Sequence, residues 1–416
     1  MEERNKGAWI IHHSNKVDKY NSQQDFEDLH IAGKCGKLLS SLTESNSEAT
    51  INKEGVEALA SANGISKLEL FGIQKILVSE QLIDVDSNGN VAVLAVTPTA
   101  LLAHTSQIFN ESNPSKVQEA SLHLAEIVAE KPKLKSELKE QLSDTFELSG
   151  EETKKLFARV DDYKIVDSDK AGQEQLFFNG NLFRNNSINK VQKVLSSVNS
   201  EEQGKINTVS EILDKTGCMS YNEGLNILGQ KLFDKLNSIG FYDVSSISND
   251  GGNHYFITKP SAFNKYGDSF VEDALDLAKA FVTSLYYGIN QSSPGRGRIN
   301  NFELLLTRLT NGEEVGPATA IGNDYRMLEL KGVIKLRRSR QYPERYFMRL
   351  AKKEIGELAL QVLKSGEAVE TLLLRHLDSN ISSYTTPETN RVNIREKIAT
   401  SSDRFGLYDK LNAIRS

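Results

Sequence analysis

Residues 66–96 read SKLELFGIQKILVSEQLIDVDSNGNVAVLAV. Ser66 is a residue type that commonly caps the start of a helix. The apolar residues that follow are spaced by three and four and share one helical face: Leu70, Ile73 and Leu77. Asn88-Gly89 is the strongest short signal for a hairpin, because both residues readily adopt positive φ. The stretch therefore predicts a helix that leads directly into a β-hairpin.

The same order of elements recurs four times along the chain. Each segment has a helix, a second short helix, a third helix with an apolar exit, and a hairpin. The segments span roughly 24–105, 116–180, 203–260 and 299–352. They share no obvious sequence identity, so the repeat is one of pattern rather than of residues.

Helix–helix–helix–hairpin units of this size resemble the winged-helix branch of the helix-turn-helix superfamily, in tandem copies and without likeness to one specific family. The resemblance implies a mostly α protein with small β-hairpins (α+β), in which tandem winged-helix domains are joined by helical linkers. Many winged helices bind DNA with the third helix in the major groove and the wing on the backbone. Others dock proteins, so the fold alone does not give the function.

The pattern divides the chain into four units, a connecting helix and a tail. The expected boundaries are 1–110, 111–187, 188–268 and 292–378 for the first to fourth units, 269–291 for a linker or dimerisation helix, and 379–416 for the C-terminal tail. The fourth unit includes a helical extension after its hairpin.

The composition is that of a globular protein, with 38% hydrophobic and 25% charged residues. No run of about 18 apolar residues is present, which argues against a membrane span. The N-terminus lacks the apolar core of a secretory signal. The two cysteines, Cys35 and Cys218, have no metal-ligand spacing, which is typical of a reduced, cytoplasmic protein. We therefore expect a cytoplasmic protein without a membrane partner.

The hairpin of the fourth unit differs from the rest of the chain in charge. Residues 333–350 read VIKLRRSRQYPERYFMRL and contain six basic residues and one acidic residue, Glu344. The whole chain has a formal net charge of −6. A focused basic surface in an acidic chain favours contact with phosphate. The alternatives are a charged edge that prevents sheet-to-sheet pairing, and a surface that docks an acidic protein.

Two sets of basic residues in the fourth unit are candidate contacts to double-stranded DNA. The wing is expected to touch the backbone through Lys335, Arg337, Arg338, Arg340 and Arg345. An Arg-Gly-Arg arm is similar to the core of an AT-hook but lacks the following proline. This arm is expected to enter an A·T-rich minor groove through Arg296 and Arg298.

A third set belongs to the expected recognition helix of the fourth unit. Residues 316–332 are predicted to form this helix, with Pro317 in its first turn. Three polar residues, spaced by four and three, would share one face toward the major groove: Thr319, Asn323 and Arg326.

The other units are less suited to DNA. In the first unit, Lys67, Gln74 and Lys75 lie off the apolar face of the third helix, but the hairpin turn at 84–90 is acidic and polar. A folding or docking role is therefore the commoner outcome for this unit. The hairpins of the second and third units are acidic, and both units are expected to act as scaffold or to bind a protein partner.

No arrangement typical of an enzyme stands out in the sequence. Residues 31–40, IAGKCGKLLS, resemble a phosphate-binding loop but have Ile31 and Leu38 where glycine and serine or threonine are needed. His12 and His13 are adjacent and would face opposite sides of a strand. We expect a non-enzymatic protein with no cofactor and no metal site.

The pattern as a whole favours a DNA-binding protein. It would serve as a transcription regulator or as the DNA-recognition component of a larger bacterial system for replication, partition or phage defence. The helix at 269–291 would act as a spacer or form a homodimer. The competing hypothesis is a protein–protein adaptor, whose winged helices dock a partner complex.

Overall fold

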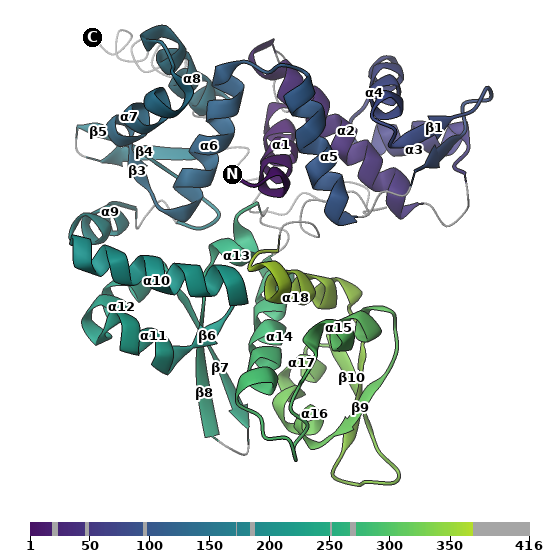
Figure 1. Ribbon diagram of the computed structural model, residues 1–416, viewed down its shortest axis with the longest axis vertical. Coiled ribbons are helices and arrows are strands. Elements are labelled where there is room, and N and C mark those ends of the chain that lie inside the picture. Colours follow the sequence, from purple (N-terminus) through teal and green to yellow (C-terminus); the bar gives the residue numbers. More distant parts are fainter. Residues whose placement is uncertain are drawn as a thin grey trace, which may run out of the picture. The chain divides into compact units, whose positions relative to one another are not determined.

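The computed structural model describes residues 1–18, 24–45, 50–94, 98–171, 173–183, 188–249, 252–266 and 272–368. These residues belong to one unit, Met1–Leu377, defined by its internal contacts. The predicted C-terminal tail lies outside the described residues. In the described part, helices dominate and the strands form small antiparallel sheets, which confirms the expected mostly α, α+β class (Figure 1). No described helix is both long and apolar enough to cross a bilayer.

The N-terminal helix α1 (Glu3–Val17) packs against α2 (Glu27–Glu44), which follows the short helix η1 (Gln24–Phe26), and against α5 (Pro98–Glu111). The backbones approach closely. A Cβ on Gly7 would lie 1.9 Å from the carbonyl oxygen of Leu102, and one on Gly33 would lie 2.3 Å from Cβ of Ser14. His12 and His13 lie on α1, so the expectation of a strand there is wrong. A helix buried around most of its circumference shows no single apolar stripe.

The first unit contains the predicted helix and hairpin. Helix α3 (Lys53–Ala62) precedes α4 (Lys67–Ser79), and the hairpin pairs β1 (Ile83–Val85) with β2 (Val91–Val93). Ser66 caps α4 and forms a reciprocal capping box with Glu69, so the predicted cap is confirmed. The turn between the strands includes Asn88 and Gly89, and Gly89 has a φ of +86°.

The second and third units are each a helix, a two-residue strand, two helices and a hairpin. The second comprises α6 (Lys116–Glu130), β3 (Lys133–Leu134), α7 (Lys135–Phe146), α8 (Gly150–Asp162), β4 (Asp167–Ala171) and β5 (Glu174–Phe178). After α9 (Ile188–Ser196), the third comprises α10 (Ser200–Thr216), β6 (Met219–Ser220), α11 (Tyr221–Leu228), α12 (Gln230–Asn237), β7 (Asp243–Asn249) and β8 (Gly252–Thr258). The short helix α13 (Ser261–Asn264) follows.

The fourth unit has the same order of elements. It comprises α15 (Phe302–Thr310), β9 (Val315–Ala318), α16 (Thr319–Asp324), α17 (Arg326–Leu330), β10 (Ile334–Arg338) and β11 (Tyr346–Leu350). In the last three units the first strand pairs with the third, giving the sheet orders β3-β5-β4, β6-β8-β7 and β10-β11-β9. The first unit has a single bridge, Ile51 to Val91, at the equivalent place.

The expectation of one recognition helix over 316–332 is wrong. Gly316 and Pro317 belong to β9 and are joined by a cis peptide bond, so Pro317 does not start a helix. The remainder is broken into α16 and α17 at Tyr325, whose φ of −115° and ψ of 10° are not helical. The Tyr325 side chain is buried with its ring 6.2 Å from that of Phe281, which lies on the helix before α15. Tertiary packing thus overrides the local helical pattern here.

The helix that was expected to act as a linker or in dimerisation is α14 (Glu272–Asn290). It packs against α18 (Lys353–Ser365), which is the predicted helical extension, and against α17 (Figure 1). Its buried apolar residues share one cluster with those of α15 and α18: Leu275, Ala278, Phe281, Val282 and Leu285. These residues stabilise the fourth unit, and a second copy of the chain could not reach them.

A buried ionic cluster joins residues from distant parts of the sequence. Lys265, 4% exposed, donates to Glu126 on α6 over 2.6 Å and lies 3.4 Å from a carboxylate oxygen of Glu367. The other oxygen of Glu126 accepts from the indole of Trp9 on α1 over 2.5 Å. Lys265 therefore neutralises two partly buried carboxylates at the junction of α1, α6 and the end of α18.

Replacing Lys265 with Met should lower the free energy of unfolding by about 3 kcal/mol, because two carboxylates would lose their cation while largely desolvated. Urea denaturation followed by circular dichroism measures this. In the control, Lys205→Met removes an exposed pair with Glu201 on α10 and should cost under about 0.5 kcal/mol. Equal stability of Lys265→Met and the parent chain would contradict the assignment.

Acid should destabilise the fold through two buried histidines. Burial lowers the pKa of His13 from 6.5 to about 3 and that of His30 to about 4. In the unfolded chain both rings bind protons near the ordinary value, so lowering the pH from 6.5 toward 4 favours unfolding. The free energy of unfolding should fall by up to about 1.4 kcal/mol per pH unit for each ring. Urea denaturation at several pH values measures this. The free energy of unfolding should fall less steeply with decreasing pH in His13→Gln than in the parent chain, and an equal pH dependence in the two would contradict the prediction.

Candidate nucleic-acid interface

The basic hairpin has one face on the core and one face in solvent. Its register pairs Ile334 with Leu350, Lys335 with Arg349, Leu336 with Met348, and Arg337 with Phe347. Because side chains alternate along a strand, Lys335, Arg337 and Arg349 share one face. All three are exposed, whereas Ile334 and Met348 on the opposite face are buried. The sheet thus presents three cations outward.

The tip of the hairpin, residues 339–345, is held by its own hydrogen bonds. The backbone N–H of Ser339 donates to the carbonyl of Arg345 over 2.8 Å, and that of Arg345 donates to the carbonyl of Tyr342 over 2.9 Å. Arg338 donates to the carbonyl of Pro343. The Arg345 guanidinium lies 4.9 Å from the ring centre of Tyr342. These contacts order the backbone of the tip and hold Arg338 and Arg345 against it.

The cations of the hairpin differ in how far they are neutralised. Arg337 forms hydrogen bonds with both carboxylate oxygens of Glu314, the shortest 2.6 Å, and lies 4.3 Å from the ring centre of Phe347. The Arg337 hydrogen bond lowers the pKa of Glu314. In the described part of the chain, Lys335 and Arg340 are exposed and have no carboxylate partner. These two side chains are the most available for an external anion.

The predicted Arg-Gly-Arg arm is docked on the fourth unit. Arg296 donates to the hydroxyl of Tyr287 and to a carboxylate oxygen of Asp324, each over 3.0 Å. The Asp324 side chain is 1% exposed, so Arg296 neutralises a buried charge. Gly297 has a φ of +110° and contacts Ala318. Arg298 is exposed and donates to the carbonyl of Ile289 over 3.0 Å.

The three residues of the expected recognition helix are distributed over two helices. Thr319 and Asn323 are half-buried on α16, and Arg326 is exposed at the start of α17. Asn323 and Arg326 line a groove of about 600 Å³ between α14, α17 and the edge strand β7, whereas Thr319 does not. The exposed surface of α17 also includes Met327 and Leu330.

Two residues of this surface were not among the predicted contacts. Arg349 faces outward beside Lys335, and Glu314 neutralises Arg337. The alternation of the strand 346–350 could have indicated Arg349. Glu314 lies in the loop before β9, and its sequence position gives no signal of contact with the hairpin.

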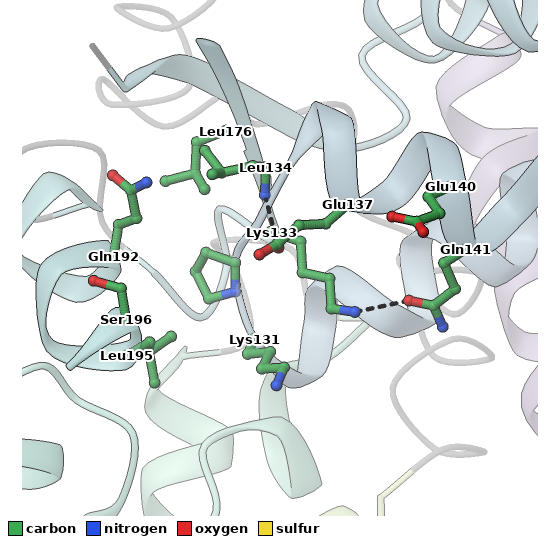
Figure 2. A pocket seen from close by; sticks show the side chains of 11 residues that line it. Lys131, Lys133, Leu134, Glu137, Glu140, Gln141, Leu176, Gln192, Leu195 and Ser196 are labelled. Carbon is green, nitrogen blue, oxygen red and sulfur yellow. Dashed lines mark hydrogen bonds between the residues drawn. The ribbon is translucent and has the colours of Figure 1, made fainter. Parts of the chain in front are cut away.

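A separate pocket of about 500 Å³ lies between β3, α7 and α9. Figure 2 shows Lys133 directed to Gln141, with the two side chains 2.7 Å apart, and Glu137 on the backbone N–H of Leu134. Gln192, Leu195 and Ser196 form the opposite wall. Lys133 and Glu137 are thus each engaged by a neighbouring group of the pocket wall.

Comparison of the chain with protein-family models and with curated proteins found no match.

The two arginines of the arm should differ in their effect on stability. Arg296→Leu should lower the free energy of unfolding by about 3 kcal/mol, because it leaves the buried Asp324 carboxylate without its cation. Arg298→Leu should change it by under about 1 kcal/mol, since the side chain is exposed. Urea denaturation of both variants tests this, and similar values for the two would contradict the structural role of Arg296.

Proposed function

We propose that the chain binds double-stranded DNA through its fourth unit, with the β10–β11 hairpin as a wing on the phosphate backbone. The observation that carries the proposal is the outward cationic face of the hairpin together with its ordered basic tip. Lys335, Arg340 and Arg349 extend from this surface into solvent. Phosphate contacts of this kind supply much of the affinity of DNA-binding proteins.

The order of elements supports the same proposal. The second to fourth units each contain a helix, a strand, two helices and a hairpin, and the first strand of each unit lies beside the third. We propose that this arrangement is a winged helix. In that arrangement α17 corresponds to the recognition helix and the β10–β11 hairpin to the wing.

The geometry favours binding with little sequence preference. Helix α17 has five residues, and its exposed side chains include the apolar Met327 and Leu330. Asn323 and Arg326 remain as candidates for base contacts, because amide and guanidinium groups can form paired hydrogen bonds with base edges. Arg296 is engaged by Asp324, which leaves Arg298 as the proposed minor-groove contact of the arm.

Fluorescence anisotropy with a labelled random-sequence duplex tests the proposal. The parent chain should bind with an affinity that falls linearly with salt concentration on logarithmic axes. The double variant Lys335→Ala/Arg340→Ala should bind at least about a hundredfold more weakly, since it removes two charge-assisted hydrogen bonds of roughly 1.5 kcal/mol each. Its salt slope should decrease by about 2, at roughly 0.9 per phosphate contact.

The matched control is Arg308→Ala on α15, where the arginine pairs with Glu313 at 2.8 Å outside the hairpin. This variant should retain the affinity and slope of the parent. A folded parent chain that fails to bind at low salt would contradict the DNA proposal and favour the protein-adaptor alternative. Equal binding by the double variant and the parent would contradict the wing assignment.

A further inference from the structure

The outer face of α4 carries an apolar stripe that the described chain leaves uncovered. Leu70, Ile73 and Leu77 on the inner face are buried. On the outer face, Leu68 is 89% exposed, Phe71 63% and Val78 42%. With Lys75 these residues form what we call the α4 seam: Leu68, Phe71, Lys75 and Val78. Grouped exposed apolar side chains of this kind mark interaction sites.

The spacing of the α4 seam is that of a helix–helix contact. The intervals of three, four and three residues are those of the core positions of a coiled coil. Lys75 lies over the ring of Phe71, with its ammonium nitrogen 4.2 Å from the ring centre, so its stem adds to the apolar surface. Gly72 lies beside Phe71, and a Cβ there would meet no atom within 4 Å. A facing helix can therefore approach the backbone closely at the middle of the α4 seam.

The α4 seam is complementary to itself when two copies run antiparallel. A twofold axis at Ile73 places Leu68 opposite Val78, and Phe71 opposite Lys75 of the second copy. Apolar side chains then meet at both ends, and each aromatic ring meets a lysine. Isologous contacts of this kind are the commonest way in which soluble chains form dimers.

The charges at the two ends of α4 are also complementary. Lys67 lies at the N-terminal end of the helix and is exposed, with its ammonium nitrogen 2.6 Å from a carboxylate oxygen of Glu57. At the C-terminal end, Gln107 donates to both Glu80 and Glu111, over 3.1 and 3.0 Å. Neither carboxylate forms an ion pair with a lysine or arginine in the described residues. The antiparallel arrangement brings Lys67 of one copy to this acidic end of the other, and it also opposes the two helix dipoles.

The helix is fixed in place before any association. Glu69 accepts from both the backbone N–H and the hydroxyl of Ser66, over 2.8 and 2.6 Å, and closes the capping box. The same carboxylate accepts from the buried Lys34 on α2 over 2.6 Å. A surface that is already ordered loses little conformational entropy on binding.

We propose that the α4 seam is a homodimer interface, in which α4 of one chain packs antiparallel on α4 of a second copy about a twofold axis near Ile73. The proposal does not depend on DNA binding. It places the dimer contact on the first unit, in contrast to the expectation for the helix at 269–291, whose apolar residues are buried.

Sedimentation velocity of the full chain over a concentration series provides the first test. The parent should dimerise at micromolar concentration, and Leu68→Glu should shift the dissociation constant upward at least about a hundredfold, because it places a carboxylate against the apolar Val78 of the second copy at both ends of the seam. The control Leu304→Glu, at an exposed position on α15, should leave the dimer unchanged. Circular dichroism verifies that each variant is folded. A parent that stays monomeric up to about 100 µM, well above the dissociation constants of specific dimers, would overturn the proposal. Retained dimerisation of Leu68→Glu would also overturn it.

Disulfide cross-linking tests the register. The native cysteines Cys35 and Cys218 are buried and do not compete. The double variant Leu68→Cys/Val78→Cys should form a cross-linked dimer under mild oxidation. The two positions are about 15 Å apart along one helix, too far for a bond within one chain. Each single variant should remain uncross-linked, since a residue does not meet its own copy in the antiparallel register. Efficient cross-linking of a single variant would overturn the proposed orientation.

Discussion

In the described residues, the position of each hairpin depends on a short strand or bridge that pairs with its second arm. In the second, third and fourth units this strand is β3, β6 and β9, with two, two and four residues. In the first unit a single bridge at Ile51 takes its place. Each such strand lies directly before or close to the second helix of its unit, so the pairing joins the hairpin to the helical layer. The same pairing provides hydrogen-bond partners for the backbone N–H and C=O groups at this junction, which buried backbone groups require. The direction in which the basic hairpin extends follows from the pairing of β9 with β11.

The fourth unit uses arginine in two distinct ways. Arg296 neutralises the buried Asp324 and bonds to Tyr287, which joins the segment after α14 to the end of α16. Lys335, Arg340 and Arg349 are directed to solvent. Arg337 is intermediate, since Glu314 and Phe347 both contact it. Burial and the presence of a carboxylate partner decide which cation stabilises the fold and which can meet a phosphate group.

The parts of the fold that local chemistry determines were predictable from the sequence. Ser66 caps α4 because its hydroxyl can accept from the third residue of the helix, and Gly89 occupies a turn because it tolerates positive φ. Two-residue strands such as β3 and β6 leave no periodic pattern. The break at Tyr325 arises from burial against Phe281, and the engagement of Arg296 arises from a residue 28 positions later in the chain. These features depend on contacts between segments distant in sequence, which propensity and spacing do not encode.

The double engagement of Glu69 restricts how this part of the chain can evolve. Glutamine at position 69 could complete the capping box but would leave the buried Lys34 with only its more distant carboxylate partner, Asp18 at 3.7 Å. Aspartate would keep the charge on a side chain too short to reach both Ser66 and Lys34. Glu69 thus both caps α4 and holds this helix against α2. The exposed residues of the α4 seam have no such double role in the fold. Selection can therefore change them one at a time while the first unit keeps its structure.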